Sequence, residues 1–183
     1  MIKLKYKGVF DIPDGEGSCV ITLTDGEEKR ALSIMTRRAM GFDLKNHSEK
    51  RNVARHSAVG VLAYILKDKG ILDQYVICID AKKDLGFNAR LENQLDGSRL
   101  PMLPDEAVLF SLVTDVDMYA TANAVQYFST PYAENAHMVA LPIQGLPDGM
   151  LKKALDKAVE DENYETASYI RDEMKRRQQN QED

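Results

Sequence analysis

The sequence predicts an α+β fold: a mixed, largely antiparallel sheet with two main helices, followed by a C-terminal α-helical hairpin. Three observations support this prediction. Several short segments alternate apolar and polar residues, which is the period of a half-exposed strand. Asp-Gly pairs stand between such segments, where they favour tight hairpin turns. Finally, longer segments repeat apolar residues every three or four positions, as amphipathic helices do. Runs of strands separated by single helices are typical of the α+β class.

The predicted strands lie mostly in the first two thirds of the chain. Ile2, Leu4 and Tyr6 alternate with lysines and indicate the first strand. Two Asp-Gly turns, Asp25-Gly26 and Asp96-Gly97, then join strand-like runs. The expected strands after the first cover residues 18–24, 29–35, 74–81, 86–92 and 99–103.

Two main helices are predicted between these strands. The first covers residues 49–69 and ends at Gly70, a residue suited to the position after a helix. The second begins at Pro104, whose fixed φ suits a first helical turn, and ends near Thr114. The predicted buried face of the first helix consists of Val59, Leu62, Ala63 and Leu66.

The last part of the chain predicts two short amphipathic helices joined by an acidic turn at residues 161–163. Helices of about three turns bury little surface alone, so we expect them to pair with each other and to contact a partner. The residues Gly145–Gly149 have the composition of a linker. We therefore expect one domain at residues 1–145 and the linker and hairpin at 146–183. The apolar residues expected to bind a partner are Leu151, Leu155, Tyr164, Ile170 and Met174.

This segment resembles the UVR motif, a helical hairpin of excision-repair nuclease subunits, Clp-type ATPases and their adaptors. The resemblance rests on the order of residues from Leu151 through Ala158, Tyr164 and Ala167 to the Ile170-Arg171-Asp172 step. UVR motifs mediate protein contacts, so the resemblance implies a protein partner or self-association. The alternative is a C-terminal hairpin that packs only on its own domain.

Composition limits the function classes. The chain has 183 residues, a formal net charge of −5 and 44% hydrophobic residues, enough for a folded core. There is no run of 18 apolar residues and no leader-like segment at the start, so we expect a cytoplasmic protein. Cys19 and Cys78 lie in apolar runs without a CxxC spacing, which favours buried thiols over a zinc site. Glycine-rich phosphate loops, GxSxG and HExxH are missing from the sequence.

One segment is basic despite the acidic balance. Its arginines suit the bidentate binding of phosphate, and we take them as candidate contacts to DNA or RNA. A solvated helix face is the alternative interpretation. The four arginines are Arg37, Arg38, Arg51 and Arg55.

Residues 1–135 resemble the bifunctional nuclease family, a DNase/RNase-type domain, in the succession of CVITLTDGEEKRALSI, RHSAVGVLAYILKDKGI, YVICIDAKKDLGFNARL and RLPMLPDEAVLFSLVTDVDMYAT. The chain keeps the histidine of one family step as His56. It has Ser57 where the family has an acid and Leu103 where the family has an arginine. Hydrolysis of a phosphodiester needs an activated water and charge stabilisation. The available groups are His56, Asp105 and Glu106, and a divalent metal such as Mg²⁺ or Mn²⁺ is the cofactor that would fit.

Two functional hypotheses follow. The first is a bacterial nuclease that acts on DNA or RNA through those three residues and reaches its partners through the hairpin. The second is a non-catalytic adaptor that binds a protein of DNA repair or of proteolysis. The structural alternatives are a buried role for His56 and simple charging of a helix N-terminus by Asp105 and Glu106. A sheet with an open edge also leads us to expect a homo-oligomer.

Overall fold

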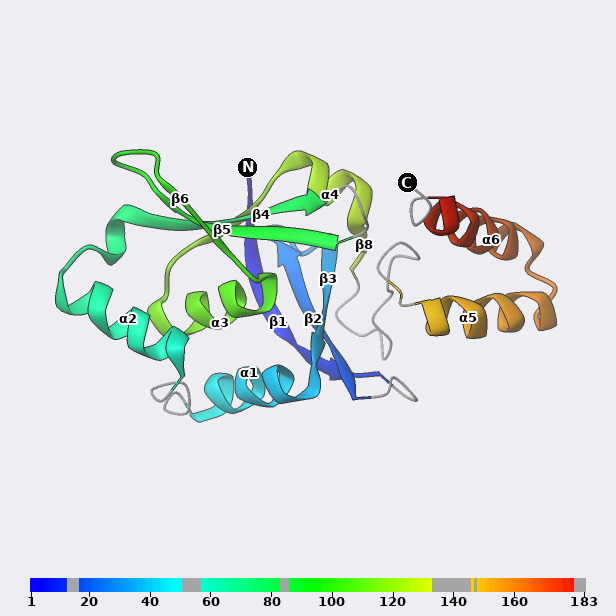
Figure 1. Cartoon of the computed structure of the whole chain (residues 1–183), viewed down its shortest axis with the longest axis horizontal. Helices are drawn as coiled ribbons and strands as arrows, with labels where there is room; N and C mark the ends of the chain where they lie inside the picture. Colours follow the sequence, from blue (N-terminus) through cyan, green and yellow to red (C-terminus); the bar gives the residue numbers. More distant parts are fainter. Residues whose placement is uncertain (13–16, 51–56, 83–85, 133–145, 147, 180–183) are drawn as a thin grey trace. The chain divides into compact units, whose positions relative to one another are not determined.

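The computed structural model describes residues 1–12, 17–50, 57–82, 86–132, 146 and 148–179 (Figure 1). The chain divides into two compact units, residues 1–140 and 141–183. The predicted domain boundary at residue 145 lies outside the described residues and stays a prediction. None of the helices in the described ranges is both long and apolar enough to cross a membrane.

The first unit is built on one eight-stranded sheet in the order β6-β5-β4-β7-β1-β2-β3-β8. Among the described residues, every pairing is antiparallel except that of β4 with β7. The prediction of a mixed, largely antiparallel sheet is thus confirmed. The strands are β1 (Ile2–Asp11), β2 (Ser18–Asp25), β3 (Arg30–Arg37), β4 (Tyr75–Lys82), β5 (Gly86–Asn93), β6 (Arg99–Met102), β7 (Met118–Ala120) and β8 (Ser129–Pro131).

The two predicted Asp-Gly hairpins are present. In the turn between β2 and β3, the Asp25 carboxylate accepts hydrogen bonds from the backbone N–H groups of Lys29 and Arg30, at 2.8 and 3.2 Å. Between β5 and β6, Gly97 has a φ of 72°, which only glycine adopts without strain. The Asp25 hydrogen bonds in the first turn and the Gly97 conformation in the second thus define the turn geometry, which sets the register of the paired strands.

The described residues of the first unit also form a short 3-10 helix (Leu72–Gln74) and four α-helices: α1 (Arg38–Lys50), α2 (Ala58–Asp68), α3 (Pro104–Thr114) and α4 (Ala122–Phe128). The α3 helix contacts α1, α2 and strands β3, β4 and β5, and Figure 1 shows it between α1 and α2. Four consecutive residues of α3, Ala107 to Phe110, are buried. A helix that is apolar on all sides must be enclosed, so α3 forms the centre of the core.

Pro104 is the first residue of α3, as predicted, and Asp105 and Glu106 occupy its first turn. The prediction of one helix over residues 49–69 is wrong. The α1 helix ends at Lys50, and α2 begins after Ser57, whose hydroxyl accepts a hydrogen bond from the backbone N–H of Gly60 at 3.0 Å. A serine in this capping geometry starts a new helix.

The buried face of α2 differs from the prediction at one of its four positions. Leu62 is 38% exposed, whereas Val59, Gly60 and Ala63 are buried. Leu66 also packs against the core, so three of the four predicted positions are confirmed and Leu62 is the exception. At the other end Gly70 has the predicted left-handed conformation, with a φ of 65°.

The second unit is a pair of helices, α5 (Asp148–Glu160) and α6 (Tyr164–Gln179), as the sequence predicts. Their shared core consists of Leu151, Ala158, Ala167 and Ile170. The connecting turn places Glu162 in the left-handed region, with a φ of 55°. The backbone N–H of Asn163 returns to the carbonyl of Ala158 at 2.8 Å, which closes the end of α5. The small side chains of Ala158 and Ala167 let the two helices approach near this turn.

Candidate functional site

The predicted catalytic acids lie at the start of α3 and have local partners. The Thr36 hydroxyl, at the end of β3, donates a hydrogen bond to Oδ2 of Asp105 at 2.7 Å. Oδ1 of Asp105 accepts from the backbone N–H of Glu106 at 3.0 Å. Both acids are half-buried. Asp105 therefore links the start of α3 to β3, a structural task that the sequence did not reveal.

The predicted phosphate contacts Arg37 and Arg38 are exposed and lie next to Thr36 in the chain. Successive side chains of a strand point to opposite faces, so Arg37 points away from the face on which Thr36 meets Asp105. Arg38 begins α1, and its backbone N–H donates to the carbonyl of Gly17 at 2.8 Å. The structure thus brings the end of β3, which leads into Arg37 and Arg38, beside the start of α3, which carries Asp105 and Glu106.

An acidic residue of β1, Asp11, contacts the basic segment. Lys45 of α1 forms an ion pair with Asp11 at 2.9 Å. The hydrogen bond from Lys45 lowers the pKa of Asp11, and one from the Cys19 thiol and the charge of Arg38 lower it further. Part of the positive charge that would attract a phosphate is therefore already balanced by Asp11.

The remaining predicted residues of this site, Arg51, Arg55 and His56, lie outside the described residues, so their roles stay predictions. The neighbouring Ser57 caps α2. Aspartate caps helices as well as serine does, so the acid found at this step in the nuclease family would suit the same structural position. Within the described ranges, no group of three His, Cys, Asp or Glu side chains is placed to hold a metal ion.

A pocket of about 710 Å³ lies between α1, α2 and α3. Neither Asp105 nor Glu106 is among its lining residues. His47, which was not among the predicted site residues, lines it and is buried. Its Nε2 lies 3.1 Å from the carbonyl oxygen of Leu112. A carbonyl can only accept, so Nε2 carries the proton. The Nδ1 atom is buried and has no hydrogen-bond partner among the described residues.

The residues predicted to bind a partner divide into two groups. Leu151 and Ile170 are buried between α5 and α6, so they hold the helices together and are not exposed to a partner. Leu155 and Met174 pack partly against the same core. Tyr164 is 67% exposed at the start of α6. For Leu155, Tyr164 and Met174, partner binding stays a prediction.

Two further apolar side chains on the hairpin are exposed, Val159 and Tyr169. Val159 is the last residue but one of α5. Tyr169 lies on α6 and is not among the residues predicted to bind a partner. A large aromatic residue on the polar side of an amphipathic helix is the signal that could have identified it.

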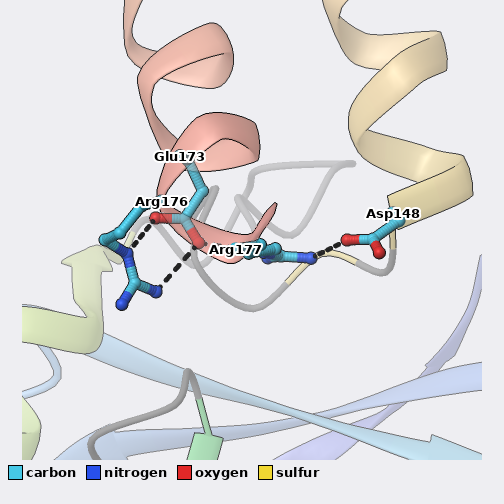
Figure 2. Close-up of polar contacts among 4 residues, drawn as sticks. All are labelled: Asp148, Glu173, Arg176 and Arg177. Atoms are coloured by element: carbon cyan, nitrogen blue, oxygen red, sulfur yellow. Dashed lines mark hydrogen bonds and ion pairs between the residues drawn. The ribbon is translucent and has the colours of Figure 1, made fainter. Parts of the chain in front are cut away.

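An ion-pair network closes the end of the hairpin away from the turn (Figure 2). The buried Glu173 carboxylate accepts hydrogen bonds from Arg176, at 3.0 and 3.2 Å, and from Nε of Arg177 at 2.9 Å. Nη1 of Arg177 also donates to Asp148, the first residue of α5, at 2.6 Å. Burial raises the pKa of Glu173, but the hydrogen bonds from the two arginines outweigh it and the pKa lies below its usual value.

Comparison with known families decides the nature of this hairpin. The family model described as the UvrB/uvrC motif, UVR, matches residues 151–179. The C-terminal hairpin is a UVR motif. The match spans nearly all of α5 and α6 and includes Glu173 and both arginines of the network. No curated protein matches the chain. The comparisons give no support to a bifunctional nuclease domain in the first unit.

Proposed function

We propose that this protein is an adaptor of the bacterial cytoplasm whose UVR hairpin binds a partner protein of DNA repair or of proteolysis. The match of the UVR family to α5 and α6 supports this function, because that family is named after subunits of a repair machine. The hairpin satisfies its own core with Leu151 and Ile170. These two residues are therefore used within the hairpin, and other apolar side chains remain exposed for a partner.

The surface that would bind the partner lies near the turn. Val159 and Tyr164 flank it and expose 47% and 67% of their surface. Between them stand three consecutive acids, residues 160–162. Tyrosine is enriched among residues that dominate interface energetics, and the acids favour a partner with basic residues around an apolar contact.

The test is direct binding between the full-length protein and purified UVR-containing repair subunits and Clp-type ATPases, measured by biolayer interferometry. We expect Tyr164→Ser to weaken binding about 10-fold or more, because a buried tyrosine anchor contributes at least 1–2 kcal/mol. Tyr127→Ser is the matched control, since Tyr127 is 64% exposed on α4 of the first unit. Equal binding by wild type and Tyr164→Ser, with both folded by circular dichroism, would refute this surface.

A second candidate function is hydrolysis of DNA or RNA phosphodiester bonds by the first unit, with His56, Asp105 and Glu106 as catalytic residues and Mg²⁺ or Mn²⁺ as cofactor. The observation that favours it is that Asp105 and Glu106 at the start of α3 lie beside the end of β3, the strand that leads into Arg37 and Arg38. The test is degradation of single- and double-stranded DNA and RNA with each metal or with EDTA. Activity should be lost in His56→Ala and Glu106→Gln, and activity that survives both variants would contradict these assignments.

A further inference from the structure

The outer face of α2 is apolar and uncovered by any described part of its own unit. Val61, Leu62, Tyr64 and Ile65 expose 51%, 38%, 71% and 48% of their surface. The inner face of the same helix is apolar too, because Val59 and Ala63 belong to the core. A helix that is apolar on all sides is normally enclosed. Four large exposed apolar residues within two turns therefore indicate that another surface covers α2.

A hollow lies beside this face. The pocket of about 710 Å³ shares Val61 and Tyr64 with it and continues to His47 of α1 and Val113 of α3. Projecting side chains and a recess thus occur on one surface. Such an arrangement is self-complementary, because a two-fold axis can place the projections of one copy into the recess of the other.

The charges on this surface are self-complementary as well. Lys67 and Asp115 both line the pocket. Neither forms an ion pair within the part of the chain that the structure describes. A partner of strong single charge would match only one of them. A second copy, rotated by a two-fold axis, would bring the Lys67 of each copy to the Asp115 of the other.

We propose that α2 and the adjoining pocket form the interface of a homodimer. The interface is isologous: Val61, Tyr64 and Ile65 of each copy pack against the same surface of the other copy. Two Lys67–Asp115 ion pairs border it and fix its register. This dimer is independent of the UVR hairpin, whose exposed surface carries a run of acids and would leave Asp115 opposed by like charge.

The first test is the molar mass of the full-length protein by light scattering and analytical ultracentrifugation, over about 1 to 100 µM. We expect a concentration-dependent dimer. Ile65→Lys should weaken it about 30-fold or more, because a charge at the centre of an apolar interface is left unpaired. Leu95→Lys is the matched control, since Leu95 is 75% exposed in the turn before β6 and should leave the dimer unchanged. A monomeric wild type, or a dimer that Leu95→Lys disrupts and Ile65→Lys does not, overturns the proposal.

The second test uses the symmetry. Lys67→Glu alone creates two like-charge contacts in its homodimer, and Asp115→Lys alone does the same. Each such contact should lower the association constant of the dimer about 5-fold. In an equimolar mixture of the two variants, the mixed dimer regains both opposite-charge pairs. We expect mixed dimers to predominate at low salt, as native mass spectrometry would show. Statistical mixing of the two variants overturns the proposal, as does loss of the dimer in Tyr164→Ser, which would place the interface on the hairpin.

Discussion

Replacing Glu173 by glutamine should loosen the UVR hairpin without unfolding the first unit. Glutamine has nearly the same shape, keeps one acceptor oxygen and removes the negative charge. Glu173 is 8% exposed and accepts hydrogen bonds from both Arg176 and Arg177. The substitution therefore weakens the contact between the end of α6 and, through Arg177, Asp148 at the start of α5.

The magnitude follows from the exposure of each partner. Arg176 is 40% exposed, so solvent screens its pair with Glu173 and we assign it about 0.5 kcal/mol. Arg177 is 16% exposed, and a hydrogen bond between charged groups at such a site contributes about 1.5 kcal/mol. The amide oxygen of glutamine can still accept a hydrogen bond from an arginine, although a weaker one than the carboxylate accepts. The expected loss is about 1.5 kcal/mol, or roughly a 10-fold increase in the population of the open hairpin.

Amide hydrogen exchange with mass spectrometry measures this opening in the full-length protein. Peptides from residues 148–179 should exchange about 10-fold faster in Glu173→Gln, and peptides from the sheet should not change. Asp172→Asn is the matched control, because it removes an exposed carboxylate from the neighbouring position of the same helix. Equal protection of the hairpin in wild type and Glu173→Gln would refute the stabilising role of the network, as would equal effects of both variants.

Three more predictions concern stability. Because the pKa of Glu173 is lowered on folding, its contribution is present above its unfolded value of about 4.5 and is lost as pH falls through the folded pKa. After correction for the slower intrinsic exchange in acid, the protection of the hairpin amides should therefore fall more in wild type than in Glu173→Gln. Gly41→Ala would place a Cβ 2.9 Å from Sγ of Cys19 and should lower the free energy of unfolding by about 2 kcal/mol in a urea titration, whereas Gly149→Ala, which meets nothing within 4 Å, should not. Ser57→Ala removes the cap of α2 and should cost about 1 kcal/mol, and Ser57→Asp should restore it; a neutral alanine variant would mean that the cap contributes nothing.

The elements with the clearest periodicity could be predicted from the sequence, and α1 could not. The hairpin helices repeat apolar residues over several turns, and both have the predicted positions within a few residues. In α1 the buried positions are Gly41, Leu44 and His47. Only one of these is a large apolar residue. Gly41 lies so close to Cys19 of β2 that there is no room for a side chain. A glycine in such a contact adds nothing to the apolar periodicity from which helices are predicted.

The candidate sites show a similar limit. The spacing of apolar residues placed Leu151 and Ile170 correctly on the apolar faces of their helices. Spacing does not show whether such a face packs against a partner protein or against the other helix of the hairpin. Asp105 looked like a free carboxylate because its partner, Thr36, is 69 residues earlier in the chain. Which polar groups are already satisfied depends on contacts between distant segments, and the sequence alone does not reveal them.

Those contacts determine which of the side chains named in each functional hypothesis remain available to bind a substrate or a partner. In the first unit, Asp105 is held by Thr36 and Asp11 by Lys45, so part of the charge proposed for a phosphate site already serves the fold. On the hairpin the reverse holds, because the core residues and the Glu173 network leave Tyr164 exposed at the turn. A side chain without an internal role, exposed on a helix of the UVR motif, is the better candidate for a binding residue. The adaptor function therefore needs no rearrangement of the described residues, whereas hydrolysis would require Asp105 to bind a metal while it anchors α3.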